Sequence, residues 1–463
     1  MPHIYLTACR ISFTGVSRIV FYTAVLLLPV DGLIWGIQMP YWSPFSPALF
    51  LLFTLLNARR LPYVVRRFPC MVPMLVLLSL ISVYGWLTIG VDWTYLFRTG
   101  FAILAMCATL AAFCIAFDPG ASSDHGAATE PNTHDSPLLS LHTVVTLLIV
   151  AYGVAFLFGV LTWLGQARHL DWGQFMNQVN GVFLRQYHSS RPQFLFAEPS
   201  YIGMHLYGVL LPLFWLTRDR RLPVLILTFA LGSLAMGSGT RIALDSAVAL
   251  VVCAIVEVPW RWVFSRTRNI VALAAGAVAG CGVIVALFAT QPRLQALASQ
   301  GLFAGDSSMS ARIIRTLAPL EAGLQDIPHL LFGFGAGNIG EAMTRGYESA
   351  MRVFLANGGM VTEEIRQLVD PRGPTSNRAG NVFTMNAYTS FITEFGVIAF
   401  AAAIGVVLWH VTRNHAWNKT TICWLLLLAY LYLQFEAYAF YALPLFLWVT
   451  STAPQRDIII RRS

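Results

Sequence analysis

Residues 141–163 read LHTVVTLLIVAYGVAFLFGVLTW and contain no Asp, Glu, Lys or Arg. An α-helix needs about 20 apolar residues to cross the hydrocarbon core of a bilayer, and this run has that length. Similar runs recur along the chain, which is 57% hydrophobic and only 11% charged, whereas about a quarter of a soluble domain is charged. The runs are too long for barrel strands, and a backbone in lipid must satisfy its own hydrogen bonds. We therefore expect an all-α polytopic membrane protein.

The hydropathy pattern predicts about twelve membrane-spanning helices. We expect them roughly at 18–37, 44–58, 71–90, 98–117, 141–163, 199–217, 222–238, 241–258, 270–290, 385–409, 420–436 and 439–453. Three connections between them are long: 118–140, 164–198 and 291–384. The chain then divides into N-terminal helices, a linker, central helices, a large late loop, and C-terminal helices with a tail, at 1–117, 118–140, 141–290, 291–384 and 385–463.

The arginines predict the orientation of these helices. The net charge is +8, and Lys419 is the only lysine. In a soluble protein such a charge would suggest nucleic acid, but short basic loops beside apolar runs are typical of the cytoplasmic side of a membrane. Three such loops are RRLPYVVRR (59–67), TRDRR (217–221) and RWVFSRTR (261–268). Both termini are then expected in the cytoplasm, and nucleic acid is not an expected partner.

The connections at 118–140 and 291–384 differ in composition. The first is acidic and rich in Ser, Pro and Gly, which is typical of a flexible cytoplasmic linker. The second contains the helical stretch SARIIRTLAPLEAGLQ (310–325), a glycine-rich turn and a further helix around 351–355. It is too long for a simple connector, so we expect a lid or a site on the outer side. No cysteine falls in a long loop and there is no CxxC pair, so neither a metal site nor a disulfide is expected.

The stretch RPQFLFAEPS (191–200) puts Arg191 and Glu198 just before the apolar run at 199–217. Pro199 is expected to be the first residue of a helix, where its missing N–H costs nothing, and it forces Glu198 into an extended conformation. The free N–H groups at such a helix end favour anions. Glu198 is then either a charge complement to the helix end or a carboxylate at the membrane surface that acts as a general base.

Four arginines on the predicted outer side lie close to a motif or a membrane edge: Arg191, Arg241, Arg312 and Arg315. A guanidinium fork matches phosphate oxygens bidentately, so such a cluster suits a lipid that carries a pyrophosphate. The alternative for Arg241 is an ion pair with Asp245 at i+4, and for the other helix a solvated face. His205, about two turns into its span, is either a functional ionisable group or a satisfied core histidine.

Two further motifs flank the end of the large loop. GFGAGN (333–338) lacks the GK[ST] of a nucleotide-binding loop, so we expect a tight turn that brings backbone N–H groups and Asn338 near a ligand. NAYTSFITEFG (386–396) places Asn386 at the outer end of a span and Glu394 about 12 Å deeper, where it needs a partner or a cavity. Asp31, Glu257 and Glu436 are interpreted as structural polar contacts.

Other classes of protein are disfavoured. No HExxH, GxSxG or paired DxD stretch lies in an external loop, which argues against a zinc protease, a serine hydrolase and a metal-dependent sugar-nucleotide transferase. A transporter or flippase is the main alternative from another class. Such proteins often contain internal repeats, and none relates residues 1–217 to 222–453.

Five motifs occur in a telling order: R-x6-EPS (191–200), GSGTR (237–241), SARIIR (310–315), GFGAGN (333–338) and NAYTSFITEFG (386–396). In this order the chain resembles the O-antigen ligase/polymerase superfamily, which are bacterial inner-membrane glycosyltransferases with a large periplasmic loop late in the chain. The resemblance covers residues 185–400 and extends to the N-terminal spans only by hydropathy.

The resemblance implies a GT-C-like architecture, a periplasmic site, an undecaprenyl-pyrophosphate-linked glycan as donor, and no metal or other cofactor. It implies that Arg191, Arg241 and Arg312 hold the pyrophosphate as the glycosidic bond breaks, and that Glu198 contacts or deprotonates the acceptor hydroxyl. Glu198, Arg191 and Arg312 are thus the expected catalytic residues. Further candidates for binding substrate or pyrophosphate are Arg315, Asn338, Asn386 and His205.

One departure from the family pattern separates its two activities. Ligases of the family typically carry His-Asn where this chain has Met385-Asn386. This difference favours a Wzy-type polymerase of O-antigen, capsule or exopolysaccharide, with a ligase or a lipid-linked oligosaccharide flippase as alternatives. The partners expected for this function are the lipid-linked oligosaccharide, membrane lipid, and flippase and chain-length regulator proteins.

Overall fold

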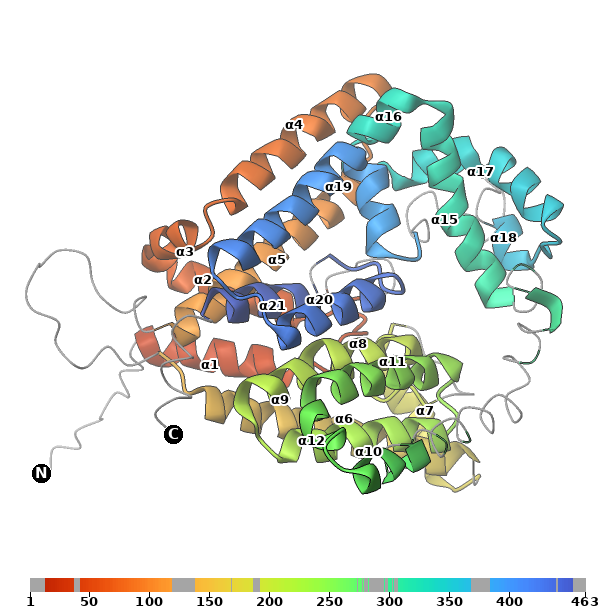
Figure 1. Cartoon of the computed structure of the whole chain (residues 1–463). Helices are drawn as coiled ribbons and strands as arrows, with labels where there is room; N and C mark the ends of the chain where they lie inside the picture. The colour runs from red at the N-terminus through yellow and green to blue at the C-terminus, as the bar shows by residue number, and fades with distance from the viewer. Residues whose placement is uncertain are drawn as a thin grey trace, which may run out of the picture.

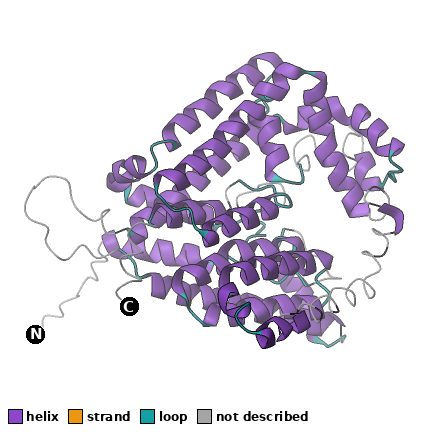
Figure 2. Cartoon of the chain, viewed as in Figure 1, coloured by secondary structure: helices purple, strands orange, loops and turns teal. Residues whose placement is uncertain are grey.

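The computed structural model describes residues 13–36, 42–118, 138–167, 169–185, 192–272, 274–276, 278, 282, 295, 299–301, 303, 307–367, 384–438 and 440–452. Within these residues the chain is helical, and its only β-pairing is two isolated bridges, Gly32 with Ser43 and Leu33 with Leu184 (Figure 2). The expected all-α class is therefore confirmed. The linker 119–137 lies outside the described residues, as does most of the expected span at 270–290.

Five of the described helices are long and apolar enough to cross a membrane. They are α4 (Met71–Ile89), α5 (Trp93–Phe117), α6 (Leu141–Ala167), the continuous helix Pro199–Thr217 and α19 (Ala387–Arg413). A bent pair, α2 (Ser46–Leu56) with the segment Ala58–Arg67, turns by 77° and would make a sixth span. These helices support a membrane protein, and the number twelve stays a prediction.

Shorter helices occupy most of the other expected spans. They are α1 (Phe13–Leu26), α10 (Arg221–Ala235), α11 (Thr240–Glu257), α20 (Lys419–Tyr432) and α21 (Ala442–Ser451). The first expected span, 18–37, was wrong in its extent, because α1 ends at Leu26. Pro29 cannot donate to the helix ladder and its ring clashes with the carbonyl four residues earlier, so the chain turns there.

Polar side chains fix where several helices begin. Asp92 accepts hydrogen bonds from the backbone N–H groups of Thr94 and Tyr95 at the start of α5. Asn386 accepts from Thr389 N at the start of α19, over 2.8 Å. Such caps satisfy N–H groups that have no partner within the helix.

A helix that the sequence did not predict, α7 (Trp172–Phe183), folds back onto α6 through a close approach of Gly173 to Gly165.

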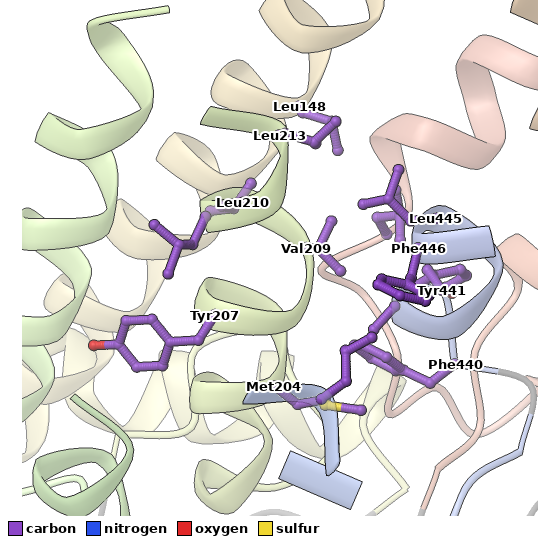
Figure 3. Packing of buried hydrophobic residues seen from close by; sticks show 14 of the residues in the cluster. Leu148, Met204, Tyr207, Val209, Leu210, Leu213, Phe440, Tyr441, Leu445 and Phe446 are labelled. Carbon is purple, nitrogen blue, oxygen red and sulfur yellow. The ribbon is translucent and has the colours of Figure 1, made fainter. Parts of the chain in front are cut away.

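The helices form two groups with α20 and α21 between them (Figure 1). One group contains α4, α5 and α19, and the other contains α1, α6, α10 and α11. The core between them is apolar: Leu148, Val209 and Leu213 line one cavity together with Tyr441 and Leu445 (Figure 3). Burial of such side chains and close packing hold the two groups together.

One end of the bundle gathers residues that are expected on the cytoplasmic side. The guanidinium of Arg67 donates to the carbonyl of Ser451, and the ring of Phe68 stacks on that of His410. Trp448 Nε1 donates to Asp118 Oδ1 over 3.1 Å. Helices from the large loop lie away from this end, beside the far end of α4 and α19 (Figure 1).

The large loop contains the helices expected for it. They are α15 (Ser307–Gln325), α16 (Ile327–Phe332), α17 (Ile339–Ala356) and α18 (Glu363–Gln367). α15 and α17 pack as a hairpin around a small core that includes Ile314, Met343 and Phe354. A Cβ on Gly346 would lie 1.8 Å from the carbonyl oxygen of Ala318, so only glycine permits this approach.

The glycine-rich turn 333–338 is inserted between α4, α5 and α19. Its N–H groups donate to the protein itself: Phe334 N to Thr393 O, Gly335 N to Glu394 O, Ala336 N to Ser82 Oγ and Gly337 N to Glu394 Oε1. The expectation that these N–H groups face a ligand is therefore wrong, because each already has an acceptor. Glu394 has the partners it was expected to need, since Thr99 and Tyr438 also donate to its carboxylate.

Gly333 gives a test of this insertion. Its φ of +77° is unfavourable for any other residue, and a Cβ there would lie 2.3 Å from the carbonyl oxygen of Glu394. Gly358 has the same φ of +77° but nothing within 4 Å of the added Cβ. With ψ at 165° this backbone conformation is open essentially to glycine alone and costs another residue about 1–3 kcal/mol, and forcing a methyl group against packed backbone adds about 1–3 kcal/mol.

We expect Gly333→Ala to lower the apparent melting temperature in detergent clearly more than Gly358→Ala does. Both variants place alanine at a positive φ, but only Gly333→Ala also forces a methyl group against the backbone of α19. Equal losses in the two variants would contradict the insertion.

Candidate functional site

Three segments meet at the start of the helix Pro199–Thr217: residues 192–198, the beginning of α11 and the loop 433–441 between α20 and α21. Pro199 is the first helical residue and Glu198 is extended, with φ −150° and ψ 146°, as expected from the sequence. The helix begins with a 3-10 turn, and a π-helical turn, Leu206–Leu210, widens it further along. Such π turns are frequent at functional sites.

Residues 192–197 form a compact plug rather than an open loop. Gln193 is buried, and its amide donates to the carbonyls of Phe196 (2.9 Å) and Ala197 (3.2 Å). Phe194 has a left-handed φ of +56° and its ring stacks on Phe156. Gly159 of α6 makes room for it, because a Cβ there would lie 2.1 Å from the Phe194 ring. The plug thus fixes the chain that leads to Glu198.

A buried polar network holds this plug in place through hydrogen bonds. Asp31 and His205 are both fully buried, and His205 Nε2 lies 2.8 Å from Asp31 Oδ2. Trp42 Nε1 donates to the same oxygen over 3.0 Å, and Ala197 N donates to Asp31 Oδ1 over 2.5 Å. The Tyr152 hydroxyl completes the network, 2.7 Å from His205 Nδ1. With Nε2 donating to Asp31 and the tyrosine hydroxyl donating to Nδ1, both ring nitrogens have a hydrogen-bond partner.

This network accounts for His205 as a positioning residue. The imidazole packs against the Phe196 ring, with 4.5 Å between ring centroids. Asp31 binds the backbone one residue before Glu198, and Gly32 approaches Ala197 so closely that a Cβ would lie 2.6 Å from its Cα. The direct contact of His205 with a ligand, expected as one possibility from the sequence, stays a prediction.

Glu198 carries the carboxylate with the fewest constraints at this end of the bundle. It is half-buried, and no hydrogen bond or ion pair joins its side chain to the described residues. Tyr201, one turn further on, donates to Glu436 Oε1 over 2.6 Å. Glu436 lies outside the helices, in the loop 433–441. Its burial raises its pKa to about 7; the Tyr201 hydrogen bond opposes this shift, and the nearby charge of Glu198 adds to it.

Arg241 and Asp245 face this carboxylate pair from the first turns of α11. Arg241 Nη2 donates to the Gln434 carbonyl over 2.5 Å, and Arg241 Nε lies 3.8 Å from Asp245 Oδ2. Tyr430 donates to Asp245 Oδ1 over 2.8 Å. The ion pair at i+4 that the sequence suggested for Arg241 is therefore present. Both residues are tied to α20 or to the chain just after it.

Among the described residues, three polar atoms at this junction are buried without a hydrogen-bond partner: Arg241 Nε, Asp245 Oδ2 and Ser200 Oγ. Unsatisfied buried polar atoms cost free energy, so they mark a place where a ligand or water would complete the bonding. Gly203 permits the packing, since a Cβ there would lie 2.0 Å from Asp245 Oδ2. This junction is the candidate site.

The large loop contributes to the junction through α15. The charge of Arg312 acts on Asp245, so Arg312 lies within electrostatic reach of the first turns of α11. Arg315, one turn later, is buried. Arg241 is thus ion-paired with Asp245, and the charge of Arg312, from the large loop, acts on the same carboxylate. Arg191 lies outside the described residues.

Two other expected residues already have partners within the protein. Asn338 donates to the carbonyls of Gly90 (2.9 Å) and Phe334 (2.8 Å), so both its N–H groups are used. Asn386 caps α19 and is buried. Their expected binding of substrate stays a prediction, and their observed contacts hold the turn 333–338 and the start of α19.

The sequence did not single out Tyr201, Gln434 and Tyr430, although they hold the ionisable groups of the junction. Tyrosine and glutamine in apolar helices give little signal, because both also pack as ordinary core residues. Asp31 and Glu436 did give a signal, since carboxylates in or near apolar spans are costly and need partners. Comparison with protein-family models, with curated proteins and with solved structures found no match.

Asp31→Asn tests the network that holds the plug. The amide places an N–H₂ group where the carboxylate accepted three donors, so at least one buried donor loses its acceptor, at a cost of about 1–3 kcal/mol. We expect a lower melting temperature in detergent and faster proteolysis. The matched control is Glu341→Gln, since Glu341 forms an exposed i,i+4 pair with Arg345, worth about 0.3–0.5 kcal/mol. A melting temperature for Asp31→Asn no lower than that of the control would show that the network is dispensable.

The raised pKa of Glu436 predicts how stability depends on pH. The folded state keeps the proton up to a pKa of about 7, whereas the unfolded chain releases it near the ordinary value of 4.5. Raising the pH from 4.5 to about 7 therefore destabilises the folded state, and the loss levels off above that range. Glu436→Gln cannot titrate, so its melting temperature should fall less over the same range. Parallel curves for the two proteins would contradict the raised pKa.

Proposed function

We propose that the chain is a bacterial polysaccharide polymerase. It would transfer a growing glycan from undecaprenyl pyrophosphate to a sugar hydroxyl of an incoming lipid-linked repeat unit. The observation that supports this proposal is the junction described above, where Arg241 pairs with Asp245, the charge of Arg312 acts on the same carboxylate, and the charge of Glu198 acts on Glu436. Guanidinium groups beside carboxylates at the end of apolar helices suit an anionic lipid headgroup and a hydroxyl acceptor.

The arginines would bind the pyrophosphate. As the bond from the anomeric carbon to the phosphate oxygen breaks, the electron pair stays on the phosphate and its negative charge rises. Guanidinium donors aimed at that oxygen lower the barrier. Arg241 Nε is buried, lies 3.8 Å from Asp245 Oδ2 and has no hydrogen-bond acceptor among the described residues, which supports its role in this contact. Arg191 and Arg315 are proposed for the same headgroup on the family resemblance.

Glu198 would accept the proton of the acceptor hydroxyl, whose oxygen then forms the new bond to the anomeric carbon. A base is most effective when its carboxylate is ionised and held near the reacting group. The plug and the Asp31 network support this role, because they hold the backbone at residue 197 while leaving the Glu198 side chain without a partner among the described residues. Inversion at the anomeric carbon follows for a single displacement of this kind.

The proposed setting is the bacterial inner membrane, with twelve spans in a GT-C-like arrangement, both termini in the cytoplasm and the junction on the periplasmic face. A flippase is the second candidate. It is disfavoured because the polar cluster lies where helices begin and loops meet rather than along a central cavity. A ligase is disfavoured by Met385-Asn386, because ligases of the family typically carry His-Asn there. Flippase and chain-length regulator proteins remain the proposed partners.

Arg312→Ala tests the function. Purified protein acting on lipid-linked repeat units should lose about 10²–10³-fold in polymerisation rate, the usual cost of removing one donor to a developing oxyanion. In the producing strain, lipid-linked single repeats should accumulate while the protein level is unchanged. Arg345→Ala is the control, since Arg345 is exposed on α17 and paired with Glu341.

The other outcomes separate the candidates. Normal chain lengths in Arg312→Ala would sink the polymerase proposal. Long polymer that stays on its lipid carrier would indicate a ligase. Single repeat units that accumulate on the cytoplasmic side would indicate a flippase.

A further inference from the structure

The short helix α16 exposes an apolar face. Ile327 is 52% exposed and Leu331 and Phe332 are also exposed, and Leu324, in the last turn of α15, adds a side chain that is 57% exposed. Water-exposed segments seldom gather so many apolar side chains, and such a patch marks a contact with a partner or with lipid. The other face of α16 is buried: His329 lies 2.9 Å from Thr88 Oγ1 and 2.7 Å from Asp326 Oδ2.

This apolar face continues the outer surfaces of two candidate membrane spans. The ring of Phe332 contacts Tyr84 of α4, with centroids 5.7 Å apart. The backbone of Leu331 abuts the kink of α19, where a Cβ on Gly396 would lie 2.2 Å from its carbonyl oxygen. Next to these contacts, α4 exposes Leu87 and α19 exposes Val397 and Ile398. α16 therefore lies within the apolar outer surface, level with the last turns of α4 (Figure 1).

The turn that follows α16 has the properties of backbone at membrane depth. Residues 333–338 are all buried, and the turn reaches back along α4 as far as Ser82. Irregular backbone is tolerated at the level of lipid chains only when it is buried in protein and its polar groups are satisfied. Its N–H groups all have acceptors, as described above. Gly85 makes the approach possible, since a Cβ there would lie 2.3 Å from Gly335 N.

We propose that residues 324–338 form a re-entrant segment, with α16 in the lipid at the boundary between headgroups and acyl chains. The leaflet is the one that contains the C-terminal end of α4 and the N-terminal end of α19. Lipid is the occupant that the continuity with α4 and α19 indicates. Amphipathic helices bury an apolar face at this depth while their polar face stays hydrated or bound to protein.

The re-entrant segment ties the large loop to the membrane. α15 ends at Gln325, directly before α16, and carries Arg312 about 20 Å from that end at 1.5 Å per residue. The α15–α17 hairpin is rigid through its own core, so anchoring its corner fixes the distance of Arg312 from the membrane surface. This inference does not depend on the polymerase proposal, because it requires only that α4 and α19 face lipid.

Depth-dependent fluorescence quenching tests the proposal. Single cysteines replace Leu324 or Ile327 in a full-length chain whose native cysteines have been exchanged, and each is labelled with an environment-sensitive fluorophore. The protein is reconstituted in phosphatidylcholine–phosphatidylglycerol vesicles containing a lipid with a nitroxide either near the headgroup or near the chain end. Leu80→Cys, on the exposed face in the middle of α4, reports deep lipid, and Glu348→Cys, exposed on α17, reports water.

Labels at 324 and 327 should lose several-fold more emission to the headgroup-proximal nitroxide than the label at 348. The label at 80 should respond most to the nitroxide near the chain end. Labels at 324 and 327 that behave like the label at 348 would overturn the proposal. Labels that are protected from both nitroxides and from aqueous iodide would overturn it too, because a second copy or another protein would then cover α16.

Discussion

The carboxylate of Asp31 is the group on which the arrangement of the site depends. It lies at zero exposure and accepts from Trp42, Ala197 and His205, which belong to three separate segments. A buried charge short of donors would be very costly, so these segments can fold only in a way that brings them together here. The position of Ala197 then fixes Glu198 and Pro199, and the helix after Pro199 presents Tyr201 to Glu436 and Gly203 to Asp245. Packing of apolar side chains stabilises the bundle, whereas this carboxylate determines how the segments around the start of the helix Pro199–Thr217 are arranged.

The same physical constraint explains the two irregular segments of the molecule. Residues 192–198 and 333–338 leave helical geometry next to apolar helices, where unsatisfied backbone is costly. In both segments a polar side chain forms hydrogen bonds with the irregular backbone, Gln193 in one and Glu394 in the other. Both also need a glycine on the facing helix, Gly159 or Gly85, to come close enough. Each of the two segments is therefore held by a polar side chain and by a glycine on the helix that faces it.

The parts that could be predicted from the sequence are those governed by local or one-dimensional rules. Apolar length located most helices, and Pro199 correctly marked a helix start with an extended Glu198 before it. The early end of α1 was missed because the apolar run continues past Pro29, where the helix cannot. The helix α7 was missed because it follows from packing on α6. Arg241 and Arg312 were noticed because arginines are unusual on the expected outer side, and Glu198 because it lies just before an apolar run. Their partners could not be predicted, because Tyr201 and Glu436 are 235 residues apart and nothing in a single sequence reports that contact.

The order in which the site's parts lie along the chain has a consequence for its synthesis. Arg241 and Asp245 belong to α11, but their partners Gln434 and Tyr430 belong to α20 and the loop after it. Until that later segment is synthesised, the nascent chain holds a guanidinium, a carboxylate and the Tyr201 hydroxyl without their final partners. Biogenesis of the protein therefore includes an interval in which these groups need temporary hydration or shielding. The backbone carbonyl that Arg241 binds is made 193 residues after Arg241 itself.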